Sequence, residues 1–190
     1  LIGADMAVVV CEPDAERMMT LVPLLKFLDD KAIPRLIFLN KVDRFDGGLT
    51  DVVAALQRVS AHPLVLRQVP IQEGEAVTGY VDLASGRAYH YQAGAGSEVI
   101  DLPGELAEAV KQARYDMLEK MSDYDDSLME MLLEDVDPDN AEVYAKLTGL
   151  FGSGDIVPVM FGAAEHEQGV RRLLKALRHD APRPEVATRR

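Results

Sequence analysis

The stretch Leu36-Ile-Phe-Leu-Asn-Lys-Val-Asp43 joins a short apolar run directly to a cluster of polar residues. Four apolar residues that end in polar ones are typical of a buried β-strand followed by a loop. Met6–Cys11 is a second run, rich in β-branched residues, that predicts another fully buried strand. Each run is followed by a segment, 14–30 or 50–59, whose apolar residues recur at helical spacing. The order strand, helix, strand, helix predicts a parallel sheet with right-handed crossovers.

The same pattern returns near the end of the chain, where the apolar run 156–161 precedes an amphipathic helical segment, 169–179. The middle differs, because predicted strands follow one another there without helices, which favours an antiparallel sheet. These strands span 64–71, 77–83 and 87–91, an acidic helical region runs from 103 to about 134, and a short helix follows through Leu150. We therefore expect an α/β fold in which a parallel sheet with helices is interrupted by an α+β insertion subdomain. The expected parts are 1–62, 63–155 and 156–190.

Charge is distributed unevenly along the 190 residues. The chain has 32 acidic and 20 basic side chains and a net charge of −12, and residues 98–142 hold fifteen acids against three bases. This acidic middle disfavours direct DNA binding, because phosphates repel it. It can face a basic protein partner, or it is a solvated face of charged helices, with Asp125 and Asp126 as solvated helix residues.

Other sequence features narrow the class of protein. The single cysteine, Cys11, excludes a disulfide scaffold, indicates a reducing compartment and is expected to pack in the core. No apolar run approaches the roughly 20 residues that a membrane span needs, so we expect a cytoplasmic protein with no membrane partner. The four histidines are scattered without metal-ligand spacing, and His166 is expected to be a plain loop residue. We predict no metal site and no catalytic residue.

The segment Asn40-Lys41-Val42-Asp43 carries the clearest chemical signal. It lies at the carboxyl end of a predicted strand, where open α/β sheets place their ligands. A carboxylate only accepts hydrogen bonds, so Asp43 suits the adjacent N1–H and N2–H₂ donors of guanine and rejects adenine. The methylene stem of Lys41 can cover the base, and Asn40 can fix the loop. The alternative is a polar turn at the end of a strand.

A turn of small residues, Gly162-Ala163-Ala164, follows the last predicted strand and lets backbone N–H groups approach a ligand. Two features expected of a complete nucleotide site are missing. No Gly-x-x-x-x-Gly-Lys-Ser/Thr phosphate loop is present, and Asp101-Leu-Pro-Gly104, although it spells Asp-x-x-Gly, is interpreted as the start of a helix.

Taken together, these segments resemble elongation factor G, a translational GTPase. The resemblance covers nearly the whole chain in order: Ile33–Arg44, Gly79–Leu83, Arg87–Tyr89, Asp125–Glu130, Ile156–Ala164 and Gly169-Val170. It implies a partial P-loop-GTPase sheet with that family's insertion, from a divergent elongation factor G-like paralogue.

The resemblance also implies the function. Asn40, Lys41 and Asp43 match the family's base-reading motif, and Ala163 and Ala164 match its last guanine-contacting motif, with Ala163 in place of the usual serine. The implied cofactors are GTP and GDP, with Mg²⁺ in the parent protein, and the implied partner is the ribosome during translocation. The phosphate loop and both switches would precede Leu1, so the parent is expected to be a GTPase and the isolated chain inactive. The alternative is a module that binds the ribosome or its stalk through the acidic insertion and has a degenerate nucleotide site.

Overall fold

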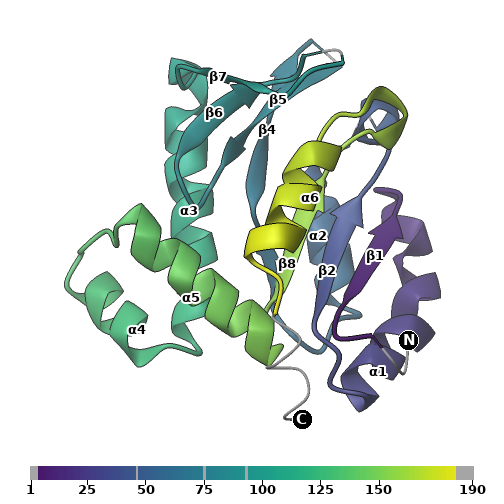
Figure 1. Cartoon of the computed structure of the whole chain (residues 1–190), viewed down its shortest axis with the longest axis vertical. Coiled ribbons are helices and arrows are strands. Elements are labelled where there is room, and N and C mark those ends of the chain that lie inside the picture. The colour runs from purple at the N-terminus through teal and green to yellow at the C-terminus, as the bar shows by residue number, and fades with distance from the viewer. Residues whose placement is uncertain (1–3, 46, 75, 93, 183–190) are drawn as a thin grey trace.

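The computed structural model describes residues 4–45, 47–74, 76–92 and 94–182, and its elements are labelled in Figure 1. A four-stranded parallel sheet has the strand order β1-β2-β8-β3. Its strands are β1 (Ala7–Cys11), β2 (Arg35–Leu39), β8 (Val157–Phe161) and β3 (Leu64–Leu66). The expected α/β fold with a parallel sheet is therefore confirmed.

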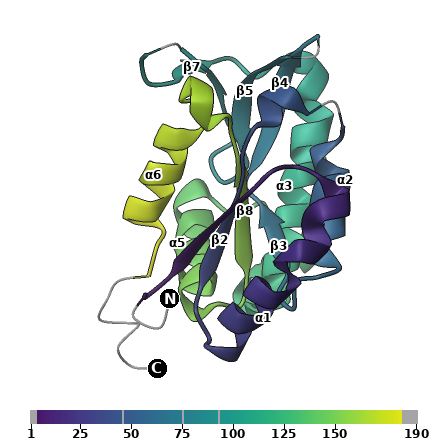
Figure 2. The same cartoon turned by 90° about the vertical axis from the view of Figure 1, so that its right-hand side faces the viewer.

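Helices cover both faces of this sheet (Figure 2). On one face, α1 (Val22–Asp30) and α2 (Leu49–Gln57) pack in a buried cluster with Ile37 and Leu39. On the other face, α6 (Val170–His179) packs against Leu36 and Phe38. Alternate residues of β2 thus serve opposite faces, as the period of a strand requires.

The first strand is only half-buried, which corrects the expectation of a fully buried strand. β1 lies at the edge of the sheet, and Val8 and Val10 are 36% and 57% exposed. They pair with Leu36 and Phe38 and so face the side that α6 covers, but the cluster around α6 includes neither valine. An apolar run in the sequence predicts a hydrophobic strand, but it does not show whether that strand lies at the centre or at the edge of its sheet.

The segment expected as one helix over 14–30 has two parts. A 3₁₀ helix, Ala15–Leu21, begins at Asp14, whose carboxylate accepts hydrogen bonds from the backbone N–H groups of Glu16 and Arg17. The α-helix α1 then begins at Val22, so Pro23 lies in its first turn. A missing N–H is harmless there, and the proline marks a helix start instead of a kink.

The insertion contains a second, antiparallel sheet in the order β4-β5-β6-β7. Its strands are β4 (Gln68–Glu73), β5 (Ala76–Asp82), β6 (Arg87–His90) and β7 (Glu98–Ile100). A tight turn joins β5 to β6, and Gly86 takes a φ of 68° in it. The short strand β7 has no counterpart in the sequence analysis, because three residues are too few to show a period.

The expected single strand 64–71 is wrong, since its two halves belong to different sheets. Leu64–Leu66 pairs in parallel with β8, and the antiparallel strand β4 begins at Gln68. Arg67 lies between the two strands, and its backbone bonds to both sheets. Its backbone N–H donates to the Val159 carbonyl at 3.0 Å, and its backbone carbonyl accepts from Leu83 N–H at 3.0 Å. The apolar pattern is continuous across the junction, so it could not reveal the change of partner.

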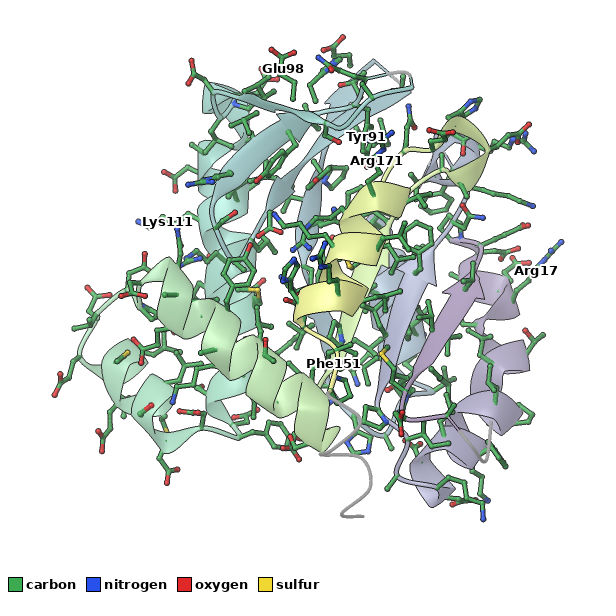
Figure 3. The ribbon with its side chains drawn as sticks, viewed as in Figure 1. Arg17, Tyr91, Glu98, Lys111, Phe151 and Arg171 are labelled. Atoms are coloured by element: carbon green, nitrogen blue, oxygen red, sulfur yellow. The ribbon has the colours of Figure 1, made fainter. Side chains whose placement is uncertain are left out.

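Three helices complete the insertion: α3 (Ala107–Ser122), α4 (Asp126–Leu133) and α5 (Asn140–Ser153). Phe151 of α5, labelled in Figure 3, is buried in one cluster with Phe38 and Met160 of the parallel sheet and Met117 of α3. The insertion therefore shares a hydrophobic core with the parallel sheet.

Pro158 lies inside the central strand β8, where a missing N–H needs explanation. Val157 N–H donates to the Pro63 carbonyl, and the Val159 carbonyl accepts from Arg67, so alternate residues of β8 face β3. Pro158 N therefore points toward β2, whose pairing with β8 begins only at Val159. The proline thus lies just before the point where the β2–β8 ladder begins.

Candidate functional site

The loop after β2 is fixed by its own backbone. Asn40 N–H donates to the carbonyl of Cys11 at 2.8 Å, which continues the β1–β2 ladder by one residue. Lys41 then takes a left-handed conformation with a φ of 65°, and a single 3₁₀ turn, Val42–Arg44, follows. This sharp reversal places the side chains of Asn40, Lys41 and Asp43 at the carboxyl edge of the parallel sheet.

The loop after β8 docks directly on this one. Gly162 N–H donates to the Leu39 carbonyl at 2.9 Å, and Val42 N–H donates to the Gly162 carbonyl at 3.2 Å. The Asn40 side chain completes the junction, because its Oδ1 accepts a hydrogen bond from Ala164 N–H at 2.9 Å. The structure thus joins two sequence motifs that lie more than a hundred residues apart.

Small residues are required in the second loop. A Cβ atom at Gly162 would lie 2.3 Å from the Gln168 carbonyl oxygen and 2.8 Å from Cζ of Phe38. Ala163 is buried and exchanges two backbone hydrogen bonds with Gln168, of 3.0 and 3.1 Å. Ala164, in contrast, is exposed beside the Asn40 side chain.

The carboxylate of Asp43 is only 19% exposed, yet its oxygens accept no hydrogen bond from the described residues. Its nearest basic neighbours are Arg44, with Nε at 3.6 Å, and His166, with Nε2 at 3.5 Å. His166 is thus in the loop, as expected, but within ion-pair distance of Asp43. The site therefore contains a partly buried carboxylate with open acceptor positions.

Two acidic residues that form ion pairs with these loops, Glu12 and Glu165, were not predicted from the sequence. Nζ of Lys41 contacts the carboxylate of Glu12, and Arg44 contacts that of Glu165. The hydrogen bond and charge of Lys41 lower the pKa of Glu12. Glu12 directly follows β1, and its position at the carboxyl end of a neighbouring parallel strand was the available signal. Glu12, Lys41 and Arg44 line one surface pocket with Phe45.

Other candidate chemistry is not supported by the part of the chain that the structure describes. Within it, no group of three metal-binding side chains is found, and no helix is long and apolar enough to cross a membrane. Asp101 is exposed and leads into the 3₁₀ turn Gly104–Leu106 before α3, as expected for a helix start. Cys11 is partly buried, and burial raises the pKa of its thiol to about 11.

Comparison with known proteins agrees with this geometry. Residues 1–183 match the family model of the elongation factor Tu GTP-binding domain. The chain is 50% identical over its whole length to an elongation factor G-like protein of Synechocystis sp., of which it covers 28%. It is 33% identical to elongation factor G of Rhodopirellula baltica over 80% of the chain and 22% of that protein.

A crystal structure from Thermus thermophilus superposes with a TM-score of 0.74 and 25% identity, covering 96% of the chain and 27% of that protein. The chain thus spans about a quarter of the length of these relatives, between 22% and 28%. Its parallel sheet, its insertion and both loops at the carboxyl edge lie within the matched residues. The chain belongs to the family of the elongation factor Tu GTP-binding domain and has the fold of a translational GTPase of the elongation factor G type.

Proposed function

We propose that this chain forms the base-binding part of the GTPase domain of a longer elongation factor G-like protein. That protein binds GTP and GDP, hydrolyses GTP and acts on the ribosome during translocation, in the cytoplasm. The family match and the elongation factor G relatives support this assignment. The alternative in which the nucleotide site is degenerate is less favoured, because the hydrogen bond from Ala164 N–H to Asn40 is intact without the serine hydroxyl at position 163.

One observation carries the proposal: the Asp43 carboxylate accepts no hydrogen bond from the described residues, although it is mostly buried. A partly buried carboxylate whose acceptor positions stay open can take donors from a ligand, and guanine supplies two adjacent N–H donors on one edge. The stem of Lys41 lies next in the chain and covers the face of the base, while Asn40 holds the second loop in place through Ala164. Ala163 supports that loop from the core.

The chain's own residues account for recognition of the base and not for hydrolysis. Phosphoryl transfer needs a phosphate cradle and Mg²⁺ to neutralise developing charge. We assign both, with the two switches, to residues outside this chain, and we expect the isolated chain to have no GTPase activity. A steady hydrolysis rate that survives repurification would contradict this.

We also propose that the chain divides into 1–62, 63–155 and 156–190, with one refinement. Leu64–Leu66 pairs with β8 in the parallel sheet, so the structural insertion begins after Arg67.

The test is Asp43→Asn in the full-length protein, with equilibrium binding of GDP, XDP and ADP. The amide presents a donor where the carboxylate accepted, and the xanthine edge presents an acceptor where guanine donates. We expect GDP affinity to fall about 100-fold or more, because buried polar groups are left unpaired, and XDP to become the preferred nucleotide.

Asp30→Asn is the matched control, since Asp30 is exposed at the end of α1, away from the loops. It removes the same charge and should change GDP affinity less than about twofold. An unchanged preference for GDP in Asp43→Asn would overturn the assignment of Asp43.

A second candidate function, docking of a basic ribosomal protein, is favoured by the surface of α4. Met129, Leu133 and Val136 are 40%, 81% and 47% exposed, and Asp126 and Glu130 lie exposed among them. Exposed apolar side chains surrounded by acids are typical of a protein-binding surface.

The test for this surface is Asp126→Lys combined with Glu130→Lys, measured by pelleting of the full-length protein with ribosomes at increasing salt. Binding should weaken and lose part of its salt dependence. The control pair is Glu105→Lys with Glu108→Lys, where two exposed acids lie near the start of α3. Equal binding by both pairs would exclude the surface of α4.

A further inference from the structure

A second concave site lies between the antiparallel sheet, α5 and α6, and shares no lining residue with the two loops described above. One pocket is lined by Arg87 and Tyr89 of β6, Tyr144 of α5, and Arg172, Lys175 and His179 of α6. A second pocket shares four of these residues and adds Arg171. The two pockets are therefore contiguous, and most of their charged lining is basic.

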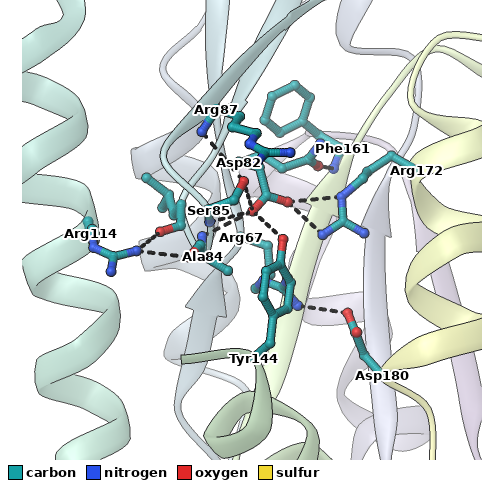
Figure 4. Close-up of polar contacts among 12 residues, drawn as sticks. Arg67, Asp82, Ala84, Ser85, Arg87, Arg114, Tyr144, Phe161, Arg172 and Asp180 are labelled. Atoms are coloured by element: carbon teal, nitrogen blue, oxygen red, sulfur yellow. Dashed lines mark hydrogen bonds and ion pairs between the residues drawn. The ribbon is translucent and has the colours of Figure 1, made fainter. Parts of the chain in front are cut away.

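The acids of this site are already paired. Asp82 accepts two hydrogen bonds from Arg172, at 2.9 and 2.6 Å, and one from the Tyr144 hydroxyl at 3.0 Å (Figure 4). Asp180 pairs with Arg67 at 3.2 Å. Burial acts to raise the pKa of Asp82, but the charges of Arg172 and Arg67 outweigh it and the pKa is lowered. The Asp82 carboxylate is thus ionised at neutral pH, and both carboxylates already have a cationic partner.

The remaining cations have no such partner. Among the described residues, no carboxylate pairs with the side chains of Arg87, Arg171 or Lys175. These three charges come from two walls of the site, β6 and α6. The site is therefore net positive, although the whole chain has a charge of −12. A concave surface of one sign of charge raises the local concentration of ions of the opposite sign, here anions.

Arg67 lines neither pocket but lies directly behind the lining residues Tyr144 and Asp180. Arg67 is 1% exposed, and its Nε and Nη2 have no hydrogen-bond partner among the described residues. Its guanidinium lies 5.8 Å from the ring centroid of Tyr144, which lines the pocket. Buried donors without acceptors carry a free-energy cost that an ordered water can relieve. Arg67 therefore contributes positive charge from behind the pocket wall and not a direct contact with a ligand.

We propose that this site binds a small phosphorylated molecule that carries two or more phosphate groups. Guanidinium groups match phosphate oxygens with paired N–H donors, and an ammonium adds a compact charge. A ligand with a single carboxylate would neutralise only one of the three unpaired cations, whereas a ligand with two or more phosphate groups can neutralise all three. The ring of Tyr89, which stacks on Tyr80 with centroids 5.0 Å apart, gives the site a rigid wall.

The test is calorimetric titration of this chain with inorganic tripolyphosphate, which has no base and so does not depend on Asp43. We expect saturable binding to one site that weakens with salt. Arg87→Ala combined with Lys175→Ala should weaken it at least tenfold. Both residues are exposed, so the fold should survive, and an unchanged thermal midpoint checks this.

The control is Arg58→Ala combined with Lys26→Ala, which removes the same charge from exposed positions of the opposite layer. Equal weakening by both pairs would reduce the effect to net charge and overturn the site. Citrate that binds as tightly as tripolyphosphate would overturn the phosphate assignment. An RNA oligonucleotide that binds this site more tightly than tripolyphosphate would overturn the assignment to a small molecule.

Discussion

Lys41 combines a strained backbone with a functional side chain. Its φ of 65° lies in the left-handed region, which costs a residue with a Cβ roughly 1–2 kcal/mol. The conformation reverses the chain directly after β2, so that Asn40 can meet Ala164 while Asp43 turns toward the same edge. Strain of this kind persists only where the surrounding structure holds it, as the docked Gly162 loop does here.

Lys41→Gly should therefore separate stability from binding. Glycine relieves the strain but adds entropy to the unfolded chain, so the free energy of unfolding should change by less than about 1 kcal/mol, in the direction of stabilisation. GDP affinity of the full-length protein should fall, because the stem that covers the base is lost. Urea unfolding and GDP titration check this, with Lys41→Ala as the control that loses the stem and keeps the strain. Marked destabilisation by glycine alone would contradict the argument.

Cys11 gives a second prediction for a single side chain. Burial raises the pKa of its thiol to about 11, so at pH 8 almost none of it is thiolate. We expect alkylation by iodoacetamide to be slow in the folded chain and to accelerate at least tenfold in urea. Rapid reaction of the folded chain, followed by mass spectrometry, would show that the thiol is accessible and activated.

Asp125 shows how one side chain defines an element. Its carboxylate accepts hydrogen bonds from Leu128 N–H at 3.1 Å, from the Ser127 hydroxyl at 2.8 Å and from Nζ of Lys146 at 2.8 Å. It therefore begins α4 and ties it to α5, which corrects the expectation that Asp125 is a solvated helix residue. Asp126, one residue later, is exposed as expected.

Asp125→Ala should lower the free energy of unfolding by about 1–2 kcal/mol, the usual effect of losing an N-cap. Asp123→Ala, an exposed position at the end of α3, should change it by less than about 0.5 kcal/mol. Urea unfolding of both variants at neutral pH makes the comparison. Equal effects would mean that Asp125 acts only through its charge.

Across the molecule as a whole, one polar network connects the insertion to the parallel sheet. Asp82 ends β5, whereas Arg172 belongs to α6 and Tyr144 to α5. The side chains of Asp82 and Arg172 are 2% and 9% exposed, so each needs the other as a partner. A buried pair of this kind is costly to break from one side.

Asp82→Asn should thus destabilise the chain by about 3–5 kcal/mol at pH 7, because Arg172 keeps its charge without a counter-ion. The folded pKa of Asp82 is lowered, so its contribution is present above the unfolded pKa near 3.8 and is lost as pH falls through the folded value. Wild-type stability should fall as the pH drops below about 4, and the variant should lose that part of the pH dependence. Parallel acid-induced slopes in urea unfolding would contradict the role of Asp82.

The amino-acid pattern alone was enough to predict the class of fold and the location of the candidate site. The runs at β1, β2 and β8 are hydrophobic enough to specify strands, and polar or small residues directly after β2 and β8 had to meet at one edge, because parallel strands end on the same side. These inferences need only the local period and the direction of each strand.

The choice of partners, in contrast, came from the three-dimensional arrangement. The folded chain divides 64–71 between two sheets at Arg67, leaves one face of β1 exposed, and pairs Lys41 with Glu12 and Asp82 with Arg172. The physical reason is that hydrophobic periodicity encodes how deeply a residue is buried, whereas hydrogen bonds and ion pairs between distant segments depend on where the chain returns in space.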